Sequence, residues 1–200
     1  RDLLRLSVRE EPRSGAVIFA NPLYDEKSTS KVPVQARRSR GMRARALGKV
    51  TWTPLPATAK EAELLVSDIP GATAYVGAEA TEGAVKAVKG PWLMHVATHG
   101  FFLPDTVKSP SEVSASENPL LRSGLVFSGA NHLRSGENDG VLTGLETATL
   151  DLRGTQMVVL SACETGVGDI ARGEGVQGLR RALIIAGSES QLMSLWQVDD

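Results

Sequence analysis

The chain contains a single cysteine, Cys163, whose position favours a reactive thiol. Cys163 directly follows the apolar run 157–162, and a second apolar run, 92–98, ends in the same way at His99 and Gly100, 64 positions earlier (163 minus 99). The thiolate is the nucleophilic form of cysteine, and a nearby imidazole that takes the thiol proton increases its population. Cys163 and His99 are therefore candidates for a nucleophile and its general base. No third catalytic residue is evident.

The two apolar runs must be neighbouring strands for this chemistry to occur. Parallel strands end at the same edge of an open sheet, and ligands bind in the crevice outside this edge. If 92–98 and 157–162 are parallel strands, His99 and Cys163 meet there. We expect both side chains to project into a crevice and not into the core.

Hydrophobic periodicity predicts strands that alternate with helices. The predicted strands are 15–20, 72–76, 92–98, 124–129, 157–162 and 191–198, and the predicted helices are 58–69, 81–90 with Thr81 as N-cap, and 174–186. This alternation is typical of a three-layer α/β/α sandwich with a mostly parallel central sheet.

Two polar segments interrupt this pattern. Residues 24–55 are rich in proline and arginine, and we expect a mobile loop there. The five arginines between Arg37 and Arg45 are typical of a solvated surface, so no direct nucleic-acid contact is expected. Residues 103–123 form a second long loop, which we expect to border a substrate groove.

Six sequence blocks, spread from about residue 90 to the end, resemble a CHAT domain, the caspase-like peptidase module often joined to tetratricopeptide repeats. The blocks are His-Val-Ala-Thr-His-Gly-Phe-Phe (95–102), Pro-Leu-Leu-Arg-Ser-Gly-Leu (119–125), Asp-Gly-Val-Leu-Thr (139–143), Leu-Ser-Ala-Cys-Glu-Thr-Gly (160–166), Gly-Glu-Gly-Val-Gln-Gly-Leu-Arg-Arg-Ala (173–182) and Ser-Leu-Trp-Gln-Val-Asp-Asp (194–200). Caspases also carry the histidine upstream of an Ala-Cys nucleophile, by roughly 50 residues. The resemblance implies one caspase-like domain over residues 1–200, truncated before the helix that usually follows the last block.

The resemblance also implies a cysteine endopeptidase that needs no cofactor and acts on a protein or peptide substrate. Cys163 would be the nucleophile and His99 the general base and acid, while the backbone amides of Gly100 and Cys163 would form the oxyanion hole. We expect control by a partner or by a fused region such as tetratricopeptide repeats. A catalytically idle CHAT-like scaffold, which binds a partner protein in the same groove, is the alternative.

The last block is similar to the strand that lines the specificity pocket of separase, an arginine-directed relative. Asp200, with Asp199 in reserve and Trp196 beside them, would then bind a basic substrate residue at P1, the position before the cleaved bond, through a charge-assisted pair. Alternatively, both aspartates cap a following helix. Ser161 stands where arginine- and lysine-specific relatives often carry aspartate, which leaves an apolar P1 residue open.

Two further patterns point to other chemistry. His95 and His99, four residues apart on one strand, could form a metal pair, but zinc requires further ligands and only His132 and one thiol remain, so we expect no metal site. We expect His95 to be a hydrogen-bonded core residue. Residues 173–178 match the dinucleotide-binding pattern Gly-x-Gly-x-x-Gly, but those glycines should directly follow a strand, and the predicted strand ends at Ala162.

Composition restricts the class of protein. Hydrophobic residues make up 42% of the chain and charged residues 22%, and the net charge of -1 argues against a nucleic-acid partner. No apolar stretch approaches the roughly 20 residues of a membrane helix, so no membrane partner is expected. One cysteine excludes an internal disulfide framework. Without a signal-peptide pattern, we expect a piece of a longer cytoplasmic protein.

Overall fold

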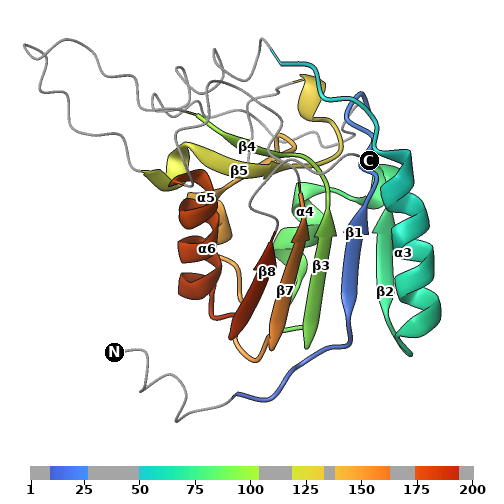
Figure 1. The fold of residues 1–200 in the computed structure, drawn as a ribbon, viewed down its shortest axis with the longest axis vertical. Helices are drawn as coiled ribbons and strands as arrows, with labels where there is room; N and C mark the ends of the chain where they lie inside the picture. The colour runs from blue at the N-terminus through green and yellow to red at the C-terminus, as the bar shows by residue number, and fades with distance from the viewer. Residues whose placement is uncertain (1–9, 27–49, 104–118, 133–137, 163–173, 194–200) are drawn as a thin grey trace, which may run out of the picture.

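A five-stranded parallel β-sheet forms the centre of the molecule (Figure 1). The computed structural model describes residues 10–26, 50–103, 119–132, 138–162 and 174–193. The strands lie in the order β2-β1-β3-β7-β8, and every neighbouring pair is parallel. Their bounds are β1 (Val17–Ala20), β2 (Thr73–Val76), β3 (Leu93–Ala97), β7 (Met157–Ser161) and β8 (Ser190–Met193). Every residue of β1 and β3 is buried, as expected for central strands with helices on both faces.

Helices cover both faces of this sheet. Helix α3 (Pro56–Asp68) packs on one face, where Ala62 contacts Ile18 and Ala20 of β1. Helices α4 (Glu82–Ala87) and α6 (Glu174–Ala186) cover the opposite face and share one hydrophobic core with the alternate β1 residues Val17 and Phe19. This α/β/α layering confirms the fold class predicted from the sequence.

A second, antiparallel sheet lies across the carboxyl end of the central sheet (Figure 1). It contains β4 (Gly100–Phe102), β5 (Ser123–Val126) and β6 (Val141–Thr143) in the order β4-β5-β6. Helix α5 (Gly144–Thr147) follows β6 directly and starts with a capping box between Thr143 and Glu146. Only Thr98 and His99 separate β3 from β4, so His99 lies at the junction of the two sheets.

The predicted helices agree well with the observed ones. Pro56 starts α3, as is typical of the first helical position, and the Thr81 side chain accepts a hydrogen bond from the Ala84 amide at the start of α4. Helix α6 has the predicted bounds, whereas α4 ends at Ala87, three residues before the predicted Gly90.

The predicted strands agree less well with the observed ones than the predicted helices do. The predicted strand 124–129 is β5, which ends at Val126 and belongs to the antiparallel sheet and not to the parallel one. The strands β4 and β6 were not predicted, because three residues are too few to display a hydrophobic period. Strand β8 ends at Met193, and residues 194–198 of the predicted strand lie outside the described residues.

The two predicted loops are described only in part. Residues 27–49 and 104–118 lie outside the described residues, so the predicted mobility and the predicted border of a groove stay predictions there. At the described ends of the first loop, Tyr24 and Trp52 are each 2% exposed and pack in one hydrophobic cluster with Phe101. Within the described part of the chain, no helix has the length and apolarity of a membrane span.

Candidate active site

The strand ends that precede His99 and Cys163 are hydrogen-bonded neighbours. Strand β3 pairs with β7 so that Ala97 lies opposite Ser161, and the Thr98 amide donates to the Ser161 carbonyl at 3.2 Å. His99 comes two residues after Ala97, and Cys163 comes two residues after Ser161 in the chain. Cys163 itself lies outside the described residues.

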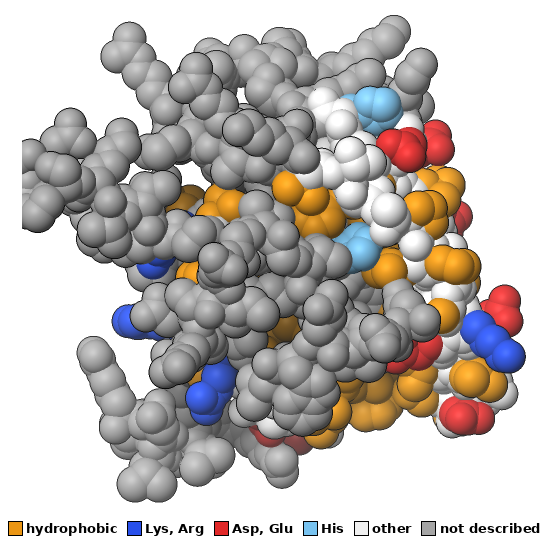
Figure 2. Space-filling view, turned by 45° about the horizontal axis from the view of Figure 1, so that its top comes forward, with side chains coloured by type: hydrophobic (Ala, Val, Ile, Leu, Met, Phe, Trp, Pro, Cys, Tyr) orange, Lys and Arg blue, Asp and Glu red, His pale blue; other side chains and the backbone are white. Residues whose placement is uncertain are grey.

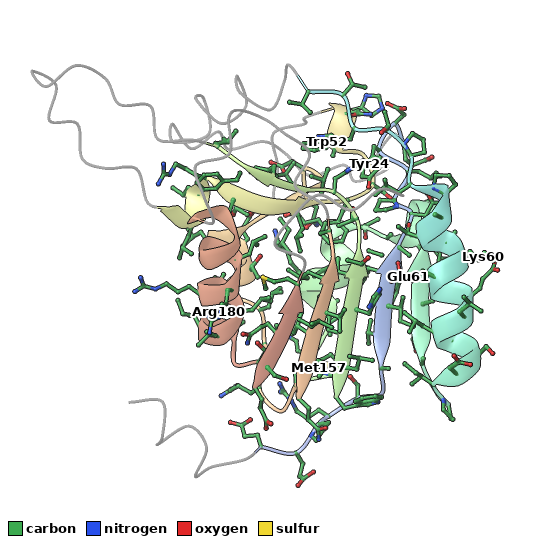
Figure 3. All side chains as sticks on the ribbon, viewed as in Figure 1. Tyr24, Trp52, Lys60, Glu61, Met157 and Arg180 are labelled. Atoms are coloured by element: carbon green, nitrogen blue, oxygen red, sulfur yellow. The ribbon has the colours of Figure 1, made fainter. Side chains whose placement is uncertain are left out.

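The His99 ring is enclosed by two aromatic side chains. The ring centroid of Tyr24 lies 5.2 Å and that of Trp52 5.5 Å from the His99 centroid, and both rings are tilted against it. Tyr24 and Trp52 lie close together above the carboxyl ends of β1 and β3 (Figure 3). Only 5% of His99 is exposed, so its ring does not project into an open crevice as expected from the sequence. Both aromatic residues belong to the predicted loop 24–55 and lie near its two ends.

A backbone carbonyl fixes the orientation of the His99 ring. The Nε2 atom of His99 lies 2.8 Å from the Thr53 carbonyl oxygen. A carbonyl oxygen only accepts, so Nε2 carries the hydrogen, and in the neutral ring Nδ1 then carries the lone pair. Sequence reasoning found no third residue beside the pair, because a main-chain carbonyl has no sequence signature.

A buried hydroxyl pair supports the same end of β3. The Tyr24 hydroxyl and the Thr98 Oγ1 atom lie 3.0 Å apart, and Thr98 Oγ1 also donates to the Val126 carbonyl. Thr98 therefore ties the Tyr24 side chain to β5. Because this residue precedes His99, the contact restrains the backbone that carries the imidazole.

The ladder between β4 and β5 determines where the Gly100 amide points. The Val126 amide donates to the His99 carbonyl at 2.9 Å, and the Leu103 amide donates to the Arg122 carbonyl at 2.6 Å. Antiparallel ladders bond through alternate residues. The N–H of Gly100 is therefore directed to the side of β4 opposite β5.

The structure describes one of the four predicted substrate-binding residues. Ser161 is the last residue of β7 and is exposed at the carboxyl edge of the sheet. Trp196, Asp199 and Asp200 lie outside the described residues. Figure 2 turns this end of the molecule towards the viewer and shows histidine side chains beside hydrophobic and acidic ones.

A model of the CHAT domain family matches residues 1–200, the whole chain. The chain belongs to the CHAT domain family. This family is related to the caspase-like peptidases. No curated protein and no solved structure matches the chain.

In this CHAT domain, His95 and His99 have separate environments. His95 is 4% exposed and faces α3, where its Nε2 atom lies 3.1 Å from Oε1 of Glu61. Burial lowers the pKa of His95, although Glu61 opposes this shift. His95 is thus a buried core residue, as predicted, and the Glu61 carboxylate is its polar neighbour. Among the described residues, no three histidine, cysteine or acidic side chains form a metal cluster.

The glycines at 175 and 178 do not form a phosphate-binding loop in this CHAT domain. Helix α6 begins at Glu174, so both glycines lie inside a helix. A dinucleotide fingerprint places its glycines in the turn between a strand and a helix. The match of residues 173–178 to that pattern is therefore a coincidence of spacing.

Proposed function

We propose that this CHAT domain is a cysteine endopeptidase that hydrolyses peptide bonds with Cys163 and His99. One observation carries most of the proposal: a carbonyl holds the ring of His99 with its lone pair on Nδ1, beside the strand that leads to Cys163. A general base needs a ring nitrogen that carries a lone pair, and the contact with Thr53 leaves Nδ1 of the neutral ring in that state. Membership of a peptidase-related family supports the same conclusion.

The reaction follows from the chemistry of these groups. Nδ1 of His99 takes the proton from Sγ of Cys163, and the thiolate attacks the carbonyl carbon of the substrate. The resulting oxyanion accepts hydrogen bonds from the amides of Gly100 and Cys163, each worth on the order of 3 kcal/mol of the barrier. When the intermediate collapses, the imidazolium protonates the leaving amine. Water, activated by the same imidazole, then hydrolyses the thioester.

The proposed substrate is a protein or peptide chain that binds along the carboxyl edge of β7. Ser161 is exposed at this edge, and we propose that Asp200, Asp199 and Trp196 line the pocket for the P1 side chain. We further propose that a partner or a fused region, such as tetratricopeptide repeats, controls access to this edge.

A thiol-reactive peptide probe tests the function. We expect an acyloxymethyl ketone peptide to label the wild-type chain and not Cys163→Ala. His99→Gln should label at least tenfold more slowly, because an amide cannot take the thiol proton. Equal labelling of wild type and His99→Gln would contradict the dyad. Tight binding of a partner without cleavage would favour the scaffold.

A further inference from the structure

One side-chain amide connects the two segments that enclose His99. Asn131 lies in the short 3-10 helix Ala130–His132, which follows β5. Its Oδ1 atom accepts from the Trp52 amide at 2.8 Å, and its Nδ2 atom donates to the Trp52 carbonyl at 3.0 Å. Nδ2 also donates to Oδ1 of Asp25 at 2.8 Å. The amide thus pairs with the backbone of Trp52 as a neighbouring strand would.

The backbone of Asn131 holds the other aromatic neighbour of His99. Its N–H donates to the Tyr24 carbonyl at 3.0 Å. Asn131 is therefore hydrogen-bonded to both residues whose rings flank the imidazole, through its main chain to Tyr24 and through its side chain to Trp52.

The contact with Trp52 extends to the carbonyl that orients His99. Residues 50–55 form no helix or strand, so no ladder fixes their peptide groups. The peptide unit between Trp52 and Thr53 is planar, and a bond to the Trp52 carbonyl orients the whole plane. Only the two backbone dihedrals of Thr53 then remain to place its own carbonyl, which lies 2.8 Å from Nε2 of His99.

We propose that Asn131 is a positioning residue, which holds the Thr53 carbonyl in place and thereby keeps His99 in the tautomer with its hydrogen on Nε2 and its lone pair on Nδ1. Asn131 acts on the imidazole through Trp52 and Thr53. The part that concerns turnover rests on the proposed peptidase function, whereas the part that concerns the tautomer does not.

The tautomer can be measured directly in the complete 200-residue chain. Two-bond ¹H–¹⁵N spectra near pH 8 distinguish a ring protonated at Nε2 from one protonated at Nδ1, and His95→Gln and His132→Gln assign the three histidines. We expect His99 to carry its hydrogen on Nε2 in the wild type. In Asn131→Ala, the Nδ1-protonated form should increase about five- to tenfold, the effect of losing one net hydrogen bond. The control is Gln156→Ala, which removes an exposed amide side chain at the other end of the sheet.

A pair of variants distinguishes an effect of Asn131 on the His99 tautomer from an effect on the stability of the fold. The same pair tests the proposal if Asn131→Ala does not fold. Asn131→Asp keeps the acceptor for the Trp52 amide but turns an oxygen towards the Trp52 carbonyl and Asp25. Adding Asp25→Asn relieves the repulsion between the two carboxylates, so we expect the melting temperature to recover. The tautomer ratio should stay altered, because the Trp52 carbonyl still has no donor from residue 131.

Turnover gives the second readout. We expect kcat of Asn131→Ala to fall roughly tenfold with KM little changed, because the proposed role of Asn131 concerns the imidazole and not the binding of substrate. An unchanged tautomer in folded Asn131→Ala, or a tautomer that recovers together with the melting temperature in the double variant, would overturn the positioning role. If no variant and no wild-type chain cleaves peptides but the tautomer shifts, the peptidase proposal fails and the positioning role stands.

Discussion

His99 is both buried and oriented, and these two properties have different consequences for its replacement. The ring is 5% exposed and packs between Tyr24 and Trp52, so its replacement removes packing contacts and lowers stability. The hydrogen bond from Nε2 to the Thr53 carbonyl instead fixes the tautomer, which affects activity. Activity and stability must therefore be measured separately at this residue.

We expect Cys163→Ala to abolish peptide cleavage because it removes the nucleophile, and His99→Gln to reduce cleavage by at least a hundredfold, the contribution typical of a general acid–base. His99→Gln should also lower the free energy of unfolding by about 2 kcal/mol, because glutamine does not restore the packing of the imidazole between Tyr24 and Trp52. Initial rates with fluorogenic peptides and urea unfolding measure the two effects. His95→Gln is the control, since His95 faces α3 and not the junction of the sheets. A larger loss of turnover in His95→Gln than in His99→Gln would show that the wrong histidine was chosen.

The proposed pocket makes a second prediction at this scale. If Asp200 pairs with a basic P1 residue, a peptide library should show a preference for arginine or lysine at P1 and a rejection of aspartate. Asp200→Asn should reduce the preference for arginine over leucine about tenfold, and Asp199→Asn provides the matched control. A basic preference that survives in Asp200→Asn, or a preference for P1 aspartate, would refute this assignment.

Sequence reasoning identified His99 because a strand that ends in His-Gly can be recognised locally. It missed Thr53, Asn131, Tyr24 and Trp52 for two reasons. Two of the interactions use main-chain atoms, which every residue has. The two aromatic residues lie at the ends of a stretch whose average composition is polar, and that average concealed them.

At the scale of elements, the length of a segment decided what could be predicted. Helix α6 spans 13 residues, and its apolar residues Leu179, Leu183 and Ala186 repeat at helical spacing, so its bounds were predicted correctly. Strands β4 and β6 have three residues each and show no period. Their pairing with β5 depends on contacts between distant parts of the chain, which no local pattern contains.

The antiparallel sheet requires a glycine at its centre. A Cβ atom on Gly124 of β5 would lie 2.5 Å from the Leu142 carbonyl oxygen and 2.7 Å from the Phe101 ring. We therefore expect Gly124→Ala to push β4 and β6 away from β5 and to lower the free energy of unfolding by about 1 to 3 kcal/mol. Urea unfolding measures this loss, and cleavage should fall as well because β4 starts at Gly100.

Gly83→Ala is the control for this prediction. Gly83 lies inside α4, and its added Cβ would approach only the side chain of Asn138, at 3.3 Å, which is exposed and can move. Alanine at this position should keep stability or raise it by up to about 1 kcal/mol, because it restricts the unfolded chain more than glycine does. If Gly124→Ala is as stable as Gly83→Ala, the close approach of β4, β5 and β6 does not contribute to the stability of the protein.

At the scale of the whole molecule, a buried carboxylate joins the outer helix layer to the antiparallel sheet. Glu82 of α4 is 1% exposed, accepts from the Gly140 amide at 2.9 Å and lies 2.5 Å from Nζ of Lys86. Lys86 also reaches Glu146 of α5 at 3.4 Å. Burial raises the pKa of Glu82 to about 7, although Lys86 lowers it.

This shift predicts how stability depends on pH. Because the folded-state pKa of Glu82 exceeds its unfolded value of 4.5, the folded protein binds the proton more tightly, and the associated stability is complete at low pH and lost as pH rises through about 7. Between pH 5 and pH 8, we expect the wild type to lose on the order of 2 kcal/mol relative to Glu82→Gln, which cannot titrate. Urea unfolding at both values measures the difference, with Glu63→Gln, an exposed acid on α3, as control. Parallel pH curves for wild type and Glu82→Gln would contradict the shift.

The layered arrangement could be predicted because alternating strands and helices permit few folds. The order β2-β1-β3-β7-β8 could not be predicted, since strand neighbours are chosen by pairing across the chain and not by local sequence. The antiparallel sheet could not be predicted either, because its strands come between β3 and β7 in the chain and interrupt the alternation of parallel strands and helices.

The pairing of β3 with β7 also sets an order in time. It joins Leu93 to Met157, 64 residues apart (157 minus 93), so closing this part of the sheet requires the entropy of a long loop to be overcome and is expected to occur late in folding. A ribosome adds about 5 to 20 residues per second, so β7 is synthesised several seconds after β3. During this interval residues 1–156 have been synthesised, and this segment includes Tyr24, Trp52 and His99 but no cysteine. The proposed base is therefore synthesised before the proposed nucleophile, and the pair can form only after residue 163 has been translated.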